Sequence, residues 1–202
     1  KTTSFSLLSA LAADNNFKIV IHLLGTANSL KESNFKDVKK ILSIDSNRTE
    51  WYPLEVNSNL NVQASSLAKM IEDSRDDDLF ERDSKILYFY SLKQHQQIDR
   101  LASILNEIFS EISPKLTLII DDEVDSYSIN TGGQGELGEE ESTTFRSLKN
   151  LYEACPLVTY VGYTATCQAV WCAHSNDFLS PDFHDLLLPG DGYKGNKEFF
   201  GK

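Results

Sequence analysis

The stretch Leu116-Thr117-Leu118-Ile119-Ile120-Asp121-Asp122-Glu123-Val124-Asp125 decides the fold. Its first half is a nearly continuous apolar run, which is typical of a central parallel strand that helices cover on both faces. Pro114 marks a break just before the run. Four acids in five positions follow it, so the end of this strand is also the first place to look for chemistry.

The rest of the sequence alternates between strand-like and helix-like patterns. Apolar runs flanked by turn residues predict three further strands, at 18–24, 85–90 and 157–163. Helical patterns lie at 2–13, 30–42, 64–72, 94–109 and 144–154. Residues 45–61 are polar and give no clear pattern, and 73–83 and 132–141 are expected to be loops. This alternation predicts an α/β fold with a mostly parallel sheet flanked by helices.

The acidic cluster predicts a magnesium site. Clustered carboxylates repel one another, and burying them unpaired is costly, so a divalent cation would resolve the conflict. Magnesium prefers one or two carboxylates together with waters and substrate phosphates. We expect Asp122 to bind the metal and Glu123 to orient the water that attacks a terminal phosphate. The alternative is a solvated acidic turn.

Two other segments carry side chains suited to phosphate chemistry. Lys1-Thr2-Thr3 directly precedes a predicted helix, whose N-terminus favours anions. In a phosphate-binding loop, a lysine reaches the outer phosphates and the next hydroxyl holds magnesium, although the glycines of such a loop are not visible here. Tyr163-Thr164-Ala165-Thr166 follows the last predicted strand, and its hydroxyls could bond to a neighbouring acid or simply form a turn.

Composition sets limits on the function. The chain has 202 residues, and no apolar run approaches the roughly 18–20 residues of a membrane-spanning helix, so we expect no membrane association and a cytoplasmic location. The three cysteines, Cys155, Cys167 and Cys172, lack the spacing of a disulfide framework. The formal net charge of −11 argues against a nucleic-acid partner unless a basic surface lies elsewhere in a longer protein.

Taken together, these motifs resemble the first RecA-like domain of superfamily-two helicases. More narrowly they resemble the Z-one domain, a family labelled as endonucleases, through 119–123, 128–131, 160–166, 179–183 and 189–193. The resemblance implies a single RecA-like P-loop domain over 1–202, in which 176–202 is a tail leading to a second RecA-like domain of a longer protein. It implies ATP and Mg²⁺ as cofactors and nucleic acid, in particular DNA, as a partner.

The same resemblance assigns roles to individual residues. Lys1, Thr2 and Thr3 would bind phosphates, with Thr2 and Asp122 at the magnesium ion and Glu123 activating water. Asp125, Thr164 and Thr166 would couple hydrolysis to movement, and Gly25, Thr26 and Asn28 would contact nucleic acid. One departure is Cys167, which stands where such families usually have proline.

Three functions remain open at this point. The first is an ATP-dependent motor acting on nucleic acid, within a restriction, repair or defence system. The second is a metal-dependent endonuclease that uses the acidic cluster itself. The third is a non-catalytic module that binds other proteins on a P-loop fold, because a fold does not determine a function.

Overall fold

The computed structural model describes residues 2–25, 28–44, 50–72, 84–127, 142–166 and 179–186, with the backbone alone described for 28–34 and 126–127. Its elements in chain order are α1 (Thr2–Asp14), β1 (Ile19–Leu24), α2 (Asn28–Ile41), β2 (Trp51–Val56), α3 (Ala64–Ile71), β3 (Ile86–Leu92), α4 (His95–Glu111), β4 (Thr117–Asp122), α5 (Val124–Tyr127), α6 (Thr143–Glu153) and β5 (Val158–Tyr163). The strands form one five-stranded sheet in the order β2-β3-β1-β4-β5. Every pair of neighbouring strands is parallel, which confirms the predicted α/β class.

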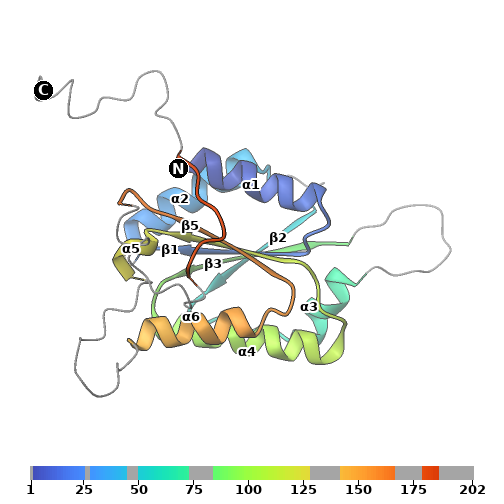
Figure 1. Cartoon of the computed structure of the whole chain (residues 1–202). Coiled ribbons are helices and arrows are strands. Elements are labelled where there is room, and N and C mark those ends of the chain that lie inside the picture. The colour runs from blue at the N-terminus through green and yellow to red at the C-terminus, as the bar shows by residue number, and fades with distance from the viewer. Residues whose placement is uncertain are drawn as a thin grey trace, which may run out of the picture.

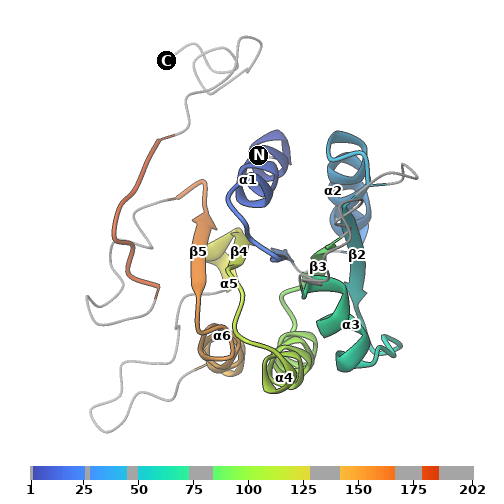
Figure 2. The ribbon, with the colours of Figure 1, turned by 90° about the vertical axis from the view of Figure 1, so that its right-hand side faces the viewer.

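Helices cover both faces of the sheet. Figure 2 shows α1 and α2 on one face and α3, α4 and α6 on the other, so that the chain forms three layers. Two hydrophobic clusters fill the spaces between the layers: Phe5 and Phe35 belong to the one beneath α1 and α2, and Leu101 and Leu151 to the one on the opposite side.

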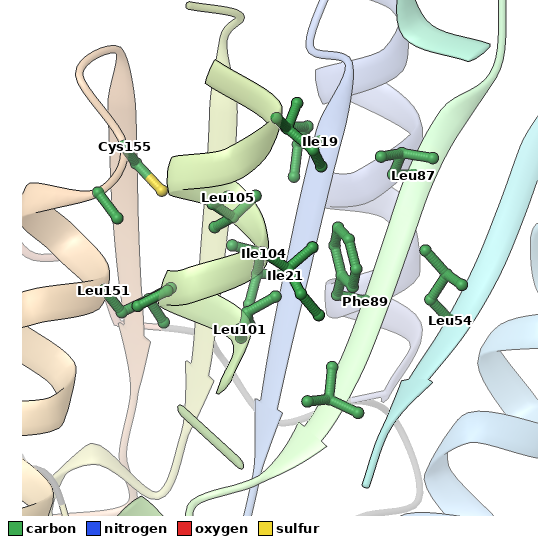
Figure 3. Close-up of a cluster of buried hydrophobic side chains, with 14 of the residues drawn as sticks. Ile19, Ile21, Leu54, Leu87, Phe89, Leu101, Ile104, Leu105, Leu151 and Cys155 are labelled. Carbon is green, nitrogen blue, oxygen red and sulfur yellow. The ribbon is translucent and has the colours of Figure 1, made fainter. Parts of the chain in front are cut away.

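The larger cluster lies between the sheet and α4. The apolar face of this helix is buried, and it comprises Ile98, Leu101, Ile104, Leu105 and Ile108. Figure 3 shows Leu101, Ile104 and Leu105 near Ile21 and Phe89 of the sheet. Burial of this many aliphatic side chains fixes the sheet as a rigid platform for its loops.

Burial also separates central strands from edge strands. Every residue of β1 and of β4 is buried, as the two-sided apolar runs predict. The last strand in the order, β5, has no fully buried residue, and its positions are half-buried or exposed. The two buried strands are neighbours, so the loops that follow them stand side by side.

The structure corrects two predictions. It has five strands where the sequence predicts four, because β2 lies in the polar segment 45–61 that gave no pattern. As an edge strand, β2 tolerates Pro53, which cannot donate to a sheet ladder. The strand β4 continues through Asp121 and Asp122, so these two acids belong to the strand and do not follow it.

Some predictions fall on residues outside the described part of the chain. They include the loops at 73–83 and 132–141, the motif segments 128–131 and 189–193, and most of the tail at 176–202, of which 179–186 is described. Lys1, Thr26 and Cys167 also lie outside the described residues. In the segments that the structure does describe, no helix is both long enough and apolar enough to cross a membrane.

Candidate functional site

At the carboxyl end of β1, the connections that follow neighbouring strands run to opposite faces of the sheet. This strand leads into α2 on one face, whereas its two neighbours, β3 and β4, lead into α4 and α6 on the other (Figure 2). In open parallel sheets, ligands bind where neighbouring strands send their connections to opposite faces. The topology therefore places the candidate site at the carboxyl ends of β1 and its neighbours.

Asp122 ends β4 with its side chain on the α1 side of the sheet. Side chains alternate along a strand, and Leu118 and Ile120 both pack in the cluster beneath α1. On the neighbouring strand, Tyr163 is the register partner of Asp122. Its Oη lies 2.9 Å from Oγ of Ser4, in the first turn of α1. The start of α1 and the buried carboxylate therefore occupy the same rim of the sheet, and Figure 1 shows the start of α1 and α5 at one end of the molecule.

The predicted phosphate-binding residues lie at this helix start. Thr2 is the first residue of α1 and is half-buried, and Thr3 is exposed. Lys1 lies outside the described residues. The backbone N–H groups of a first helical turn have no partners within the helix and favour an anion. Ser4 was not predicted from the sequence, since nothing local distinguishes it from the other hydroxyls of this segment.

Glu123 forms a turn directly after β4. Its φ of 57° lies in the left-handed region that residues other than glycine rarely adopt. The half-buried carboxylate reaches back over the end of β1, where a Cβ added to Gly25 would stand 2.9 Å from Oε2. Of the three residues predicted to contact nucleic acid, Gly25 thus lies against the predicted catalytic acid. Thr26 falls outside the described residues, and Asn28 begins α2 with no side chain described.

The predicted coupling residues contact one another. The Oγ1 hydroxyl of Thr166 donates a hydrogen bond to Oδ2 of Asp125, in the short helix α5 after β4. The backbone N–H of Thr166 donates to Oγ1 of Thr164 over 2.8 Å, so the two threonines form one turn after β5. The sequence left open whether these hydroxyls bond to a neighbouring acid or form a turn, and the structure shows both contacts. The ends of β4 and β5 are thereby joined.

The structure corrects the idea that a cation alone balances the four acids. Asp121 points to the face opposite Asp122, and both its side chain and that of Lys93 are fully buried. Nζ of Lys93 lies 2.8 Å from Oδ1 of Asp121. The hydroxyl of Tyr160 donates to Oδ2 of the same carboxylate. A buried charge is stable when it is paired and hydrogen-bonded, so lysine and not metal balances Asp121.

Lys93 and Tyr160 were missed because their signal is not local. A buried acid at the end of a central strand requires a cationic partner, and the partner here follows β3, an interior strand separated from β4 by β1. That inference needs the strand order, which the sequence does not state. His95, which is next but one after Lys93, is half-buried at the start of α4.

His22 lies in the core, as expected for a histidine within an apolar strand. Its ring contacts Phe5 edge-on, with centroids 4.7 Å apart, and Nδ1 lies 3.0 Å from Oη of Tyr88. Burial lowers the pKa of His22 to about 4, and the carboxylate of Asp122 opposes this shift in part. The imidazole is therefore neutral at pH 7 and does not add positive charge beside Asp122.

The described ranges contain no group of three or more His, Cys, Asp or Glu side chains placed to share an ion. They therefore give no support for a metal held by protein ligands alone. A nucleotide-bound magnesium differs, because it takes most of its ligands from water and phosphates and needs only one or two carboxylates. Asp122, which is 7% exposed at the end of a rigid strand, fits that need. Cys155 is buried and free, and burial raises the pKa of its thiol to about 12.

No known protein family matches the chain, and no curated protein is significantly similar to it in sequence. The resemblance to helicases and to the Z-one domain therefore stays a prediction that rests on the motifs alone.

Proposed function

We propose that this chain is a RecA-like domain that hydrolyses ATP with magnesium and drives a motor acting on nucleic acid. In this proposal Asp122 binds the magnesium ion and Glu123 orients the attacking water. The start of α1, with Thr2 and Thr3, binds the phosphates, and Lys1 reaches their outer oxygens.

The contact between Ser4 and Tyr163 carries the proposal. It brings the first turn of α1 to the end of β5, where Tyr163 is the register partner of Asp122 on β4. Adjacent strands lie about 4.8 Å apart, so an anion at the helix start and a cation on Asp122 would be close enough to interact. A nucleotide polyphosphate with its magnesium ion has this combination of charges.

The hydrogen bond from Thr166 to Asp125 supports the motor part of the proposal. A movement of the turn after β4 would shift the end of β5, because this hydrogen bond joins the two segments. In a motor, such a link would pass the state of the nucleotide to a second domain and to nucleic acid. The net charge of −11 means that the nucleic-acid surface would depend on a few local basic groups or on another part of a longer protein.

The endonuclease alternative has weaker support. It needs several carboxylates around shared metal ions. Asp121 and Asp122 point to opposite faces of the sheet, and Lys93 already pairs with Asp121.

One set of assays separates the three functions. ATP hydrolysis is measured with Mg²⁺ for the parent chain and for Glu123→Gln, Asp122→Ala and Lys1→Ala, with and without DNA or RNA, and DNA cleavage is measured without ATP. A motor domain would hydrolyse ATP, would be stimulated by nucleic acid, and would lose activity in all three variants. Cleavage without ATP that survives Lys1→Ala but not Asp122→Ala would indicate the nuclease. An absence of nucleotide binding would indicate the interaction module.

A further inference from the structure

Lys93 is a buried lysine that lies where three strands end. Lys93 directly follows β3, and its backbone N–H donates to the carbonyl of Leu24, the last residue of β1, over 3.0 Å. Its Nζ donates to the carbonyl oxygens of Asp122 and Glu123, the latter over 2.9 Å. One residue thus ties together the ends of β1, β3 and β4, which are the three strands around the candidate site.

The ammonium group of Lys93 is surrounded by acceptors from three consecutive residues. Besides the two carbonyls it meets the carboxylate of Asp121 at 2.8 Å. The lysine thus donates hydrogen bonds to two backbone carbonyls and forms an ion pair with a carboxylate of the residue just before them. The carboxylate also accepts from Tyr160, so the ion pair is well bonded. An ordinary counter-ion would need only the carboxylate, whereas this lysine also binds the backbone of the turn.

The turn has a conformation that requires support. Glu123 has a φ of 57°, which a residue with a side chain adopts rarely and only where its surroundings hold it. The two carbonyls that Lys93 binds belong to Asp122 and Glu123, so they lie in the two peptide units on either side of the Glu123 Cα, where the unusual φ occurs. The same conformation sends the Glu123 carboxylate over Gly25.

We propose that Lys93 is a positioning residue that holds the Asp122-Glu123 turn in the shape needed for hydrolysis, in addition to balancing the charge of Asp121. The proposal rests on the function proposed above for the same turn. Without Lys93 the peptide relaxes toward ordinary φ values, and the Glu123 carboxylate moves away from the end of β1. The rate of the chemical step then falls more than the affinity for nucleotide, because α1 still binds the phosphates.

The test separates the carbonyl contacts from the charge balance. Lys93→Met alone would leave Asp121 buried without its cation and could unfold the protein. The informative variant is therefore Lys93→Met combined with Asp121→Asn, which removes both charges. Asp121→Asn alone is the matched reference, because it keeps the lysine and its bonds to the two carbonyls. It also leaves the buried ammonium without its carboxylate, so circular dichroism and thermal melting are measured for both variants. If Asp121→Asn does not fold, the parent takes its place as the reference.

Two readouts compare the double variant with its reference. Amide hydrogen exchange is measured for the peptide covering 121–125, and steady-state kinetics give kcat and KM for ATP. We expect exchange to be at least tenfold faster in the double variant, kcat to be at least tenfold lower, and KM to stay within about threefold.

Hydrogen exchange needs no activity, so it tests Lys93 even if the proposed function is wrong. If the folded parent hydrolyses no ATP, the proposed function is wrong. Faster exchange in the double variant would still support the role of Lys93 in holding the turn. Equal exchange in the two variants would overturn the inference. In an active parent, faster exchange with the kcat of the reference would overturn it as well.

Discussion

The carboxylate of Glu123 lies directly against Gly25, since a Cβ added to this glycine would stand 2.9 Å from Oε2. The two residues follow the neighbouring strands β4 and β1. Glycine permits this close approach because it has no side chain. Gly25 therefore fixes how far the proposed catalytic carboxylate can reach over the end of β1.

A methyl group at this position should displace the carboxylate without disturbing the fold. We expect Gly25→Ala to lower kcat for ATP hydrolysis by roughly tenfold or more, because small displacements of a catalytic group are costly. The clash involves the flexible end of a glutamate, so the melting temperature should change little. Kinetics and thermal melting of the same preparation test this. An unchanged kcat in the folded variant would show that the approach to Gly25 does not matter for hydrolysis.

The bond between Thr166 and Asp125 predicts a coupling defect. Thr166→Val keeps the shape of the side chain and removes the donor. We expect the stimulation of ATP hydrolysis by nucleic acid to fall to less than about one third of that of the parent. The matched control is Thr159→Val, at an exposed position of β5. Equal stimulation in the two variants would contradict a coupling role for Thr166.

His22 predicts a dependence of stability on pH. Its pKa is about 4 in the folded chain and 6.5 as its ordinary value, so the unfolded chain takes up the proton first as pH falls. Well above pH 6.5 the imidazole is neutral in both the folded and the unfolded chain, so His22 causes no loss of stability there. Between pH 6.5 and 4 it is lost progressively, and the contribution of His22 to this loss reaches about 3 kcal/mol at pH 4.

Urea unfolding of the parent and of His22→Gln at several pH values between 7 and 4 isolates this contribution. Glutamine has no proton to gain, so the free energy of unfolding should fall less steeply in the variant. Parallel curves for the two proteins would mean that His22 is not the group responsible.

The hydroxyl of Tyr160 should stabilise the fold through the buried carboxylate of Asp121. Loss of a hydrogen bond to a buried charged group typically costs about 1–3 kcal/mol. We expect Tyr160→Phe to lower the free energy of unfolding by that amount. Tyr52→Phe, at an exposed tyrosine of the edge strand β2, is the control and should stay within about 0.5 kcal/mol. Similar losses in both variants would argue against a special role for Tyr160.

The sequence predicted the central strands well, because burial on both faces leaves a local pattern. The apolar run before Asp121 has this form, and β4 is buried throughout. The edge strand β2 was missed because its six residues mix buried, half-buried and exposed positions without a regular pattern and include Pro53. Strand order was also out of reach, since it depends on contacts between segments far apart in the chain.

The candidate site was predicted where its residues are adjacent in sequence and missed where they meet only in space. The pattern at 121–125 identified Asp122 and Glu123 as the residues to examine. It could not show that Asp121 turns to the other face, or that Lys93 binds it, because both follow from the pleat and the register of the sheet. The approach of Glu123 to Gly25 depends in the same way on β1 and β4 being neighbours.

The most direct test of the central claim is the rate of Mg²⁺-dependent ATP hydrolysis by Glu123→Gln, measured together with its affinity for ATP. Glutamine keeps the size of the side chain and removes the charge that would orient the attacking water. The proposed mechanism predicts that kcat falls by about a hundredfold or more while ATP still binds. A variant that hydrolyses ATP as fast as the parent would show that the turn after β4 is not the hydrolytic site.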